Sequence, residues 1–256
     1  MLKNSIIYAE GRKMKVIIVE NYEEASVEAA KVMLEVVKNN PTANLGLATG
    51  STPIRLYELM IEDHKKNGTS YKDIKTFNLD EYFGLEPTHP QSYHYFMEQH
   101  LFKDIDINPE NVHVPNGAGE IQKSCDDYNE LLANNQLDIQ LLGIGSNGHI
   151  GFNEPGTAFD SVTHMIELKE STRQDNARLF FNGNIDEVPT HAITMGISNI
   201  LAAKKLLLVA CGENKAAPIK VLVEGEKTVD VPASALQDHD DVTVIIDKAA
   251  ASLLTK

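Results

Sequence analysis

Residues 145–154, Gly-Ser-Asn-Gly-His-Ile-Gly-Phe-Asn-Glu, place one histidine and one glutamate in a run rich in glycine. The apolar residues 137–144 before them predict a buried strand, so this polar run leaves a sheet at the carboxyl end of a strand. Histidine is the usual general acid or base near neutral pH, and a nearby carboxylate can orient its ring. We therefore interpret His149 as a catalytic acid–base group. A structural histidine next to an Asn147-Gly148 turn is the alternative.

Two adjacent carboxylates, Asp80 and Glu81, directly follow the apolar residues 76–79, which predict another strand. Burying a carboxylate costs free energy unless the group is paired or used in chemistry. Successive residues of a strand face opposite sides, so one of the two should point into a site. We favour Asp80, because it comes first after the apolar run. Two solvated carboxylates at the start of a loop are the alternative.

A third strand exit, Thr49-Gly50-Ser51-Thr52-Pro53, has the composition of an anion-binding turn. Gly50 lets a ligand approach the backbone closely. Unpaired N–H groups and the partial positive charge of a helix N-terminus favour a phosphate there. A plain strand–helix turn capped by Thr52 is the alternative. The run matches neither a Walker loop nor a dinucleotide fingerprint, which disfavours ATP and NAD.

The chain is acidic, so each isolated cation near a strand exit gains weight as a partner for a phosphate. Its 37 Asp and Glu against 23 Lys and Arg give a formal charge of −14, without a basic block, which argues against nucleic acid as a partner. Arg173 lies in a Ser-Thr-Arg run, and Lys215 follows the apolar residues 205–210. Arginine can bind phosphate through two N–H groups, and lysine supplies a point charge. Each of them alone is more typical of a solvated surface charge.

Other classes of protein are disfavoured by what the sequence lacks. The two cysteines, Cys125 and Cys211, stand alone, and no His or Cys pair has ligand spacing, so we expect no disulfide framework and no metal. No apolar run is long enough to cross a membrane. Residues 1–13 lack the apolar core of a signal peptide, and Met14 begins a second start-like run. We therefore expect a cytoplasmic protein with a leader at 1–13, outside the fold.

Strand-like and helical runs alternate from residue 14 to the end, which predicts one α/β domain over residues 14–256. The expected architecture is a doubly wound, mostly parallel open sheet with helices on both faces, which is Rossmann-like. In such a sheet the carboxyl ends of the strands meet at one edge, where the polar exits should form one site. Residues 157–189 are poorly periodic and predict a lid or an antiparallel excursion. We expect strands at 15–19, 44–48, 76–79, 137–143, 205–210 and 242–247, shorter ones at 164–168 and 192–195, and helices at 23–38, 53–66, 93–101, 120–134 and 215–223.

Five ordered segments of the chain resemble the glucosamine-6-phosphate deaminases, the NagB family, and the likeness covers essentially everything from Met14 onward. Family members convert glucosamine 6-phosphate and water to fructose 6-phosphate and ammonia. The resemblance therefore implies a NagB-type fold, a small sugar phosphate as ligand, and neither a metal nor an organic cofactor. The segments are 45–53, 77–85 followed by His89-Pro90 and Ser92-Tyr93, 142–155, 171–178 and 212–216.

The resemblance also implies a role for each candidate residue. Asp80 corresponds to the base that moves a proton from C2 to C1 of the sugar, and His149 to the group that opens the pyranose ring. Glu154 and Asn147 correspond to the partners of that histidine. Many members carry Asp in place of Asn147, and a neutral amide orients the imidazole without stabilising imidazolium, which affects the acid limb of the pH profile. The implied phosphate site comprises Thr49, Gly50, Ser51, Thr52, Arg173 and Lys215.

Two further functions and the oligomeric state stay open at this point. A 6-phosphogluconolactonase shares the fold and a related glycine-rich exit, but hydrolysing an ester needs no isomerisation base. A sugar-phosphate sensor usually carries a helix-turn-helix, for which residues 1–13 are too short. Monomer and homo-oligomer are both compatible with the sequence. Regulated hexamers of the family rely partly on a longer C-terminal segment, and only nine residues follow Asp247, so we expect no activation by N-acetylglucosamine 6-phosphate.

Overall fold

An eight-stranded sheet forms the centre of the computed structural model, which describes residues 5–9, 11–168, 170, 173–174, 177–178 and 181–255. The strand order is β1-β2-β11-β10-β7-β3-β4-β6, and the neighbours are parallel except for β1 with β2. The expected mostly parallel α/β sheet is thereby confirmed. Its strands are β1 (Ser5–Tyr8), β2 (Met14–Val19), β3 (Asn44–Leu47), β4 (Lys75–Asn78), β6 (Val112–His113), β7 (Ile139–Leu142), β10 (Leu206–Ala210) and β11 (Val242–Asp247).

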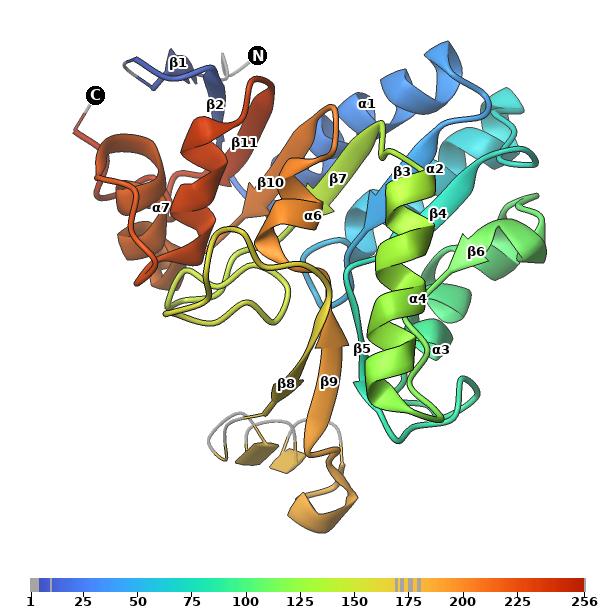
Figure 1. The fold of residues 1–256 in the computed structure, drawn as a ribbon. Coiled ribbons are helices and arrows are strands. Elements are labelled where there is room, and N and C mark those ends of the chain that lie inside the picture. The colour runs from blue at the N-terminus through green and yellow to red at the C-terminus, as the bar shows by residue number, and fades with distance from the viewer. Residues whose placement is uncertain are drawn as a thin grey trace.

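Helices cover both faces of this sheet, as Figure 1 shows. Each is amphipathic or apolar toward the strands: α1, for example, buries Ala25, Ala29 and Met33 on one face. Asn21 caps α1 by accepting a hydrogen bond from the N–H of Glu24 at 3.0 Å. The helices are α1 (Tyr22–Asn39), α2 (Ile54–Asn67), α3 (Tyr93–His100), α4 (Ile121–Asn134), α6 (Ile197–Leu201) and α7 (Ala216–Glu224), with short 3₁₀ turns at Phe102–Asp104, Pro109–Asn111, Ile185–Glu187, Glu213–Lys215 and Pro232–Asp238.

The core lies where the central strands meet these helices. Strand β10 is buried along its whole length, with Leu206, Leu207 and Leu208 at 0% exposure. A strand that is covered on both faces reads as a continuous apolar run, which is why this element was visible in the sequence. In the part of the chain that the structure describes, none of the helices has the length and apolar character needed to span a membrane.

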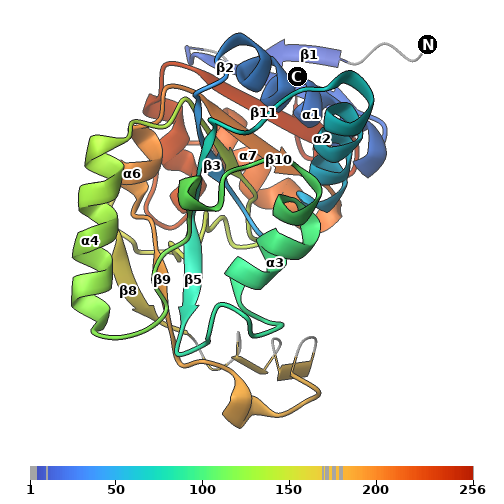
Figure 2. The ribbon, with the colours of Figure 1, turned by 90° about the vertical axis from the view of Figure 1, so that its right-hand side faces the viewer.

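A second, three-stranded antiparallel sheet projects from one end of the molecule (Figures 1 and 2). Its order is β5 (Asp80–Phe83), β9 (His191–Thr194) and β8 (His164–Glu167). Leu79 alone separates β4 from β5, so the chain passes directly from the large sheet into the small one. The sequence predicted a lid or an antiparallel excursion within residues 157–189, and the antiparallel pairing of β8 with β9 confirms the second of these. Asp80 and Glu81, expected directly after the strand at 76–79, instead begin a separate strand, β5, which the sequence did not predict.

The segment before Met14 also differs from its expected place outside the fold. Strand β1 pairs with β2, with Ser5 opposite Ile18. The Arg12 guanidinium donates to the carbonyl oxygens of Leu222 and Val223 at 2.9 and 2.6 Å. The described residues of 1–13 therefore pack on the sheet and on the end of α7. The division of the chain at residue 14 stays a prediction.

Candidate active site

Four parallel strands of the large sheet end in the polar segments that the sequence singled out. Residues 48–53 follow β3, residues 79–80 follow β4, residues 143–154 follow β7, and residues 211–215 follow β10. The carboxyl ends of parallel strands lie at one edge of a sheet, which is where ligands bind in open α/β folds. A cavity of about 40 Å³ lies between the first and third of these segments, lined by Thr49, Thr52 and Gly143 among others.

Asp80 is buried against the glycine-rich loop. The residue is 7% exposed, and its Oδ2 lies 3.4 Å from the place a Cβ on Gly151 would occupy. Thr194 stands opposite Asp80 in β9, and its hydroxyl accepts a hydrogen bond from the N–H of Phe152 at 3.1 Å. Burial, and after it the negative charge of Glu81, raises the pKa of Asp80 to about 8. Asp80 is therefore a carboxylate of unusually high basicity beside the loop that carries His149.

Glu81 faces the other way, toward the start of α3. Its carboxylate accepts hydrogen bonds from the backbone N–H groups of Tyr82 at 2.8 Å, Tyr93 at 2.9 Å and His94 at 2.9 Å. Burial raises the pKa of Glu81 to about 6, although these hydrogen bonds favour the charged form. Of the two carboxylates, Asp80 is the one that lies against the glycine-rich loop, and its role in a site stays a prediction.

The orientation of His149 is set by its neighbours in the loop. Its Nδ1 lies 2.7 Å from Oδ1 of Asn147 and 3.3 Å from Oε1 of Glu154. Both neighbours accept hydrogen bonds, so the neutral ring carries its proton on Nδ1 and its lone pair on Nε2. The Nδ2 group of Asn147 donates to Oε2 of Glu154 at 2.8 Å. The ring also lies directly over Gly145, where a side chain would collide with it.

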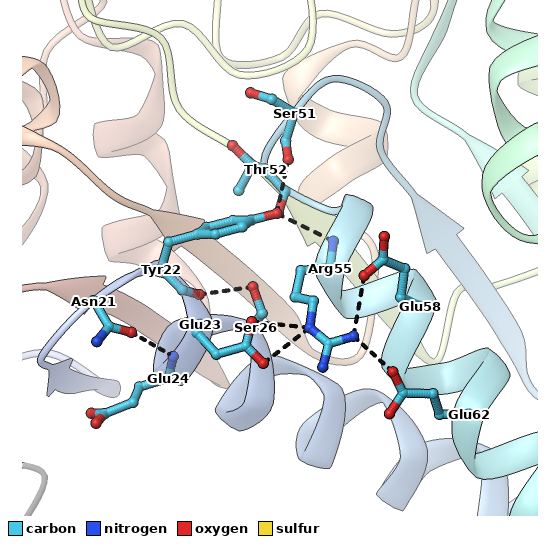
Figure 3. Close-up of polar contacts among 10 residues, drawn as sticks. All are labelled: Asn21, Tyr22, Glu23, Glu24, Ser26, Ser51, Thr52, Arg55, Glu58 and Glu62. Atoms are coloured by element: carbon cyan, nitrogen blue, oxygen red, sulfur yellow. Dashed lines mark hydrogen bonds and ion pairs between the residues drawn. The ribbon is translucent and has the colours of Figure 1, made fainter.

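The turn between β3 and α2 is organised by a tyrosine that the sequence analysis missed (Figure 3). The Tyr22 hydroxyl donates toward the carbonyl oxygens of Ser51 and Thr52, at 3.0 and 3.2 Å, and accepts from the N–H of Arg55 at 3.2 Å. Thr52 was a candidate for the N-cap of α2, but Pro53 occupies that position. The helix has no capping hydrogen bond from a side chain there. Gly50 has a φ of +96° with open space around it, which leaves its backbone accessible to a ligand.

The guanidinium of Arg55 is near this turn but already has partners. Glu23 lies 3.0 Å from its Nε, and Glu58 and Glu62 lie 3.1 and 2.8 Å from its Nη1 (Figure 3). Three carboxylates around one cation leave no net positive charge to offer an anion. The attraction for an anion must therefore come from backbone N–H groups and from other cations.

Lys215 and Arg173, the two cations expected at the site, are placed differently. Lys215 ends the 3₁₀ turn before α7, and partial burial lowers the pKa of its amine. The guanidinium of Arg173 donates to the carbonyl oxygens of Ile185 and Val188, at 2.9 and 3.3 Å. It is thus directed at a neighbouring segment of the chain, and its contact with a phosphate stays a prediction. Its sequence neighbours Ser171 and Thr172 lie outside the described residues.

Aromatic rings line the side of the loop next to α3. Tyr93 stacks on Phe152 with ring centroids 6.1 Å apart and an interplanar angle of 7°. Tyr82 lies 4.9 Å from Tyr93 and 5.9 Å from Phe152. This cluster was not predicted from the sequence, although each ring directly neighbours a polar motif. Within the described residues, no three His, Cys, Asp or Glu side chains gather as a metal site.

A family model described as glucosamine-6-phosphate isomerases/6-phosphogluconolactonase matches residues 20–245. The chain belongs to this family. A glucosamine-6-phosphate deaminase of Geobacillus sp. (strain WCH70) is 51% identical over 243 residues, covering 94% of this chain and 96% of the relative. The deaminase of Clostridium botulinum (strain Alaska E43 / Type E3) is 50% identical over 243 residues, covering 94% and 97%. The resemblance to the NagB family is thereby confirmed.

Solved structures give the same fold. One is described as a monomeric glucosamine-6-phosphate deaminase and a missing link of the NagB superfamily: it is 48% identical, has a TM-score of 0.88, and covers 93% of this chain and 99% of its own. The 6-phosphogluconolactonase from Trypanosoma cruzi is 20% identical with a TM-score of 0.76, covering 98% and 99%. At that identity the comparison shows a shared fold, and it carries no information about the reaction of this chain.

Proposed function

We propose that this protein converts D-glucosamine 6-phosphate and water to D-fructose 6-phosphate and ammonia, in the cytoplasm, as a step of amino-sugar breakdown. The observation that carries the proposal is a buried carboxylate, Asp80, lying against the loop that holds a tautomer-fixed histidine, His149. Identity of about half over nearly the whole length to deaminases supports it. Hydrolysis of a lactone requires no carboxylate of raised basicity.

The first step is opening of the sugar ring. His149 moves a proton between the ring oxygen and the C1 hydroxyl through Nε2, because Nδ1 is held by Asn147 and Glu154. Glu154 is hydrogen-bonded to Asn147, so the two partners fix each other as well as the imidazole. Ring opening produces an aldehyde at C1, which acidifies the proton on C2.

The second step is isomerisation by Asp80. Its carboxylate takes the proton from C2 to give an enol, and returns a proton to C1. The amine-bearing C2 then becomes a ketimine, which water hydrolyses to the ketone and ammonia. A pKa near 8 makes Asp80 a much stronger base than an exposed carboxylate, and a base is most effective when its pKa is near the working pH. The ammonium group of the substrate would favour the ionised form of this base.

The phosphate is assigned to the opposite end of the sugar. We assign Thr49, Gly50, Ser51 and Thr52 to it, because the open backbone at Gly50 precedes the N-terminus of α2. Lys215 supplies a cation at the exit of β10, and Arg173 supplies a second one if its side chain leaves the carbonyl oxygens that it now contacts. A phosphate held here would anchor the substrate while its C1 and C2 atoms react elsewhere.

Ammonia release tests this assignment. The purified protein is incubated with glucosamine 6-phosphate in the presence of a chelator, and ammonia and fructose 6-phosphate are assayed in parallel. Equal amounts of both, with and without chelator, are expected. Hydrolysis of 6-phosphogluconolactone in place of this reaction would establish the lactonase. A rise in melting temperature with the substrate, without either product, would indicate a sensor.

A further inference from the structure

Glu81 is a buried acidic group that the proposed mechanism does not use. It is 3% exposed, and its negative charge is met by three backbone N–H groups. Two of these belong to Tyr93 and His94, the first residues of α3, whose N–H groups have no partner within the helix. The helix dipole also favours an anion at this end. Glu81 therefore joins β5 to the N-terminus of α3, which lies beside it in Figure 2.

The same end of α3 also contacts the loop of His149. The ring of Tyr93 stacks on Phe152, which follows Gly151 in the loop. The N–H of Phe152 is bound to the Thr194 hydroxyl in β9, opposite Asp80. Helix α3 is thus in contact with both halves of the site: with the strand of Asp80 through Glu81, and with the histidine loop through Tyr93.

The side chain of Glu81 also packs against the backbone at Gly117. A Cβ on Gly117 would lie 3.3 Å from its Cγ, so the side chain packs closely against that glycine. Ser92 caps the same helix independently, because its hydroxyl accepts from the N–H of Tyr95 at 3.0 Å. The helix therefore keeps one cap when Glu81 is changed, and variants of Glu81 can be expected to fold.

We propose that Glu81 is a positioning residue of the deaminase site, which joins strand β5 to helix α3 and so holds Asp80 in register with the loop of His149. The inference rests on the proposed function and adds to it a group that does not touch the substrate. This clamp, formed by the Glu81 carboxylate and the N–H groups of Tyr93 and His94, keeps the base and the ring-opening group at a fixed separation. Misplacing a catalytic group by about 1 Å can cost about 100-fold in rate.

The charge of Glu81 has a second, separable effect. Asp80 also interacts electrostatically with Tyr82, Tyr93 and Tyr128, but burial raises the pKa of each phenol, so all three stay neutral at working pH. Glu81 is then the charged group that opposes ionisation of Asp80 within the described residues. Without that charge, Asp80 ionises at lower pH.

The experiment compares Glu81→Gln, Glu81→Asp and the wild type, with Glu98→Gln as the control. Glu98 is an exposed residue of the same helix, so its change removes one charge without touching the clamp. Wild-type ammonia release, measured first, tests the deaminase function alone. The kcat, KM and pH profile of the variants relative to it, with melting temperatures, then test Glu81. Titration of the Asp80 carboxyl by nuclear magnetic resonance gives a readout that does not depend on turnover.

The two variants separate the effect of the length of the side chain from the effect of its charge. Glu81→Gln loses the charge and one acceptor, so kcat should fall about 10-fold or more, with KM within threefold, and the acid limb should move down by about one pH unit. Glu81→Asp keeps the charge and cannot span to α3, so kcat should fall while the acid limb stays. A variant with a lower melting temperature but wild-type kcat and pH profile would show a merely structural cap and overturn the proposal.

If Glu81→Gln does not fold, Glu81→Asp decides through kcat below its melting temperature, and wild-type kcat overturns the proposal. Tyr93→Leu supplies an independent variant, because it removes the stacking on Phe152 and leaves the backbone N–H bond to Glu81 in place. Its kcat should fall without a change in the titration of Asp80. Wild-type kcat in Tyr93→Leu would refute the link between α3 and the loop.

Discussion

Replacing Asp80 by asparagine should stabilise the protein while it abolishes turnover. The folded protein holds the pKa of Asp80 at about 8, against 3.8 for the ordinary group. The folded state therefore binds this proton more tightly than the unfolded state. The free energy of unfolding is consequently not reduced by Asp80 below about pH 4, and it falls as the pH rises from there toward 8. Asparagine has the same shape and never ionises, so its variant does not lose that stability.

The magnitude follows from the size of the shift. About four pH units at 1.36 kcal/mol each set an upper limit of ~5 kcal/mol above pH 8. The buried amide N–H groups of asparagine offset ~1–3 kcal/mol of this if they find no acceptor. A net gain of ~2–4 kcal/mol corresponds to a rise in melting temperature of roughly 5–10 °C for a chain of this size.

Circular dichroism melts at pH 5 and pH 8.5 test this directly, without substrate or phosphate in the buffer. We expect Asp80→Asn to melt above the wild type at pH 8.5, with a smaller difference at pH 5. Asp126→Asn, at an exposed position of α4, is the matched control and should change neither value by more than 1–2 °C. Equal melting temperatures of wild type and Asp80→Asn at pH 8.5, or a difference that does not depend on pH, would refute the reasoning.

Three further substitutions test the other parts of the site. His149→Gln should slow turnover of the cyclic substrate far more than that of an open-chain analogue, and equal loss on both in steady-state assays would count against ring opening. Asn147→Asp places a carboxylate next to Nδ1 and stabilises imidazolium, so the acid limb of kcat/KM should move to higher pH; an unchanged profile would contradict the tautomer argument. Tyr22→Phe removes the hydroxyl that holds the turn after β3, a loss of about 1 kcal/mol, so KM should rise about fivefold with kcat unchanged, and a fall in kcat alone would exclude a role in phosphate binding.

Elements with a strong local pattern could be predicted from the sequence closely. Strand β11 has the bounds expected from its apolar run, and α1 and α4 begin and end within a residue of their predicted limits. The polar exits of β3, β4, β7 and β10 could be placed at one edge, because alternation of strands and helices requires a parallel sheet. The loop of His149 was visible for the same reason: glycines around one histidine are a local signal.

What could not be predicted depends on contacts far along the chain. Strand β5 exists because residues 80–83 pair with residues 191–194, about 110 positions later. The two carboxylates at its start are more typical of a loop, so the local sequence does not indicate a strand. The roles of Tyr22 and Glu81 follow from the N-termini of α2 and α3, which only the folded structure brings to them. Arg173 could be recognised as a candidate, but its present contacts with Ile185 and Val188 have no signal in the sequence.

The most direct test of the account follows glucosamine 6-phosphate by nuclear magnetic resonance with the wild type and Asp80→Asn side by side. The wild type should produce ammonium and fructose 6-phosphate in equal amounts, and Asp80→Asn should lose at least about 1,000-fold in rate while it still binds the substrate, since a base acts mainly in the transition state. Turnover by Asp80→Asn within tenfold of the wild type, or loss of substrate without ammonium, would contradict the assignment.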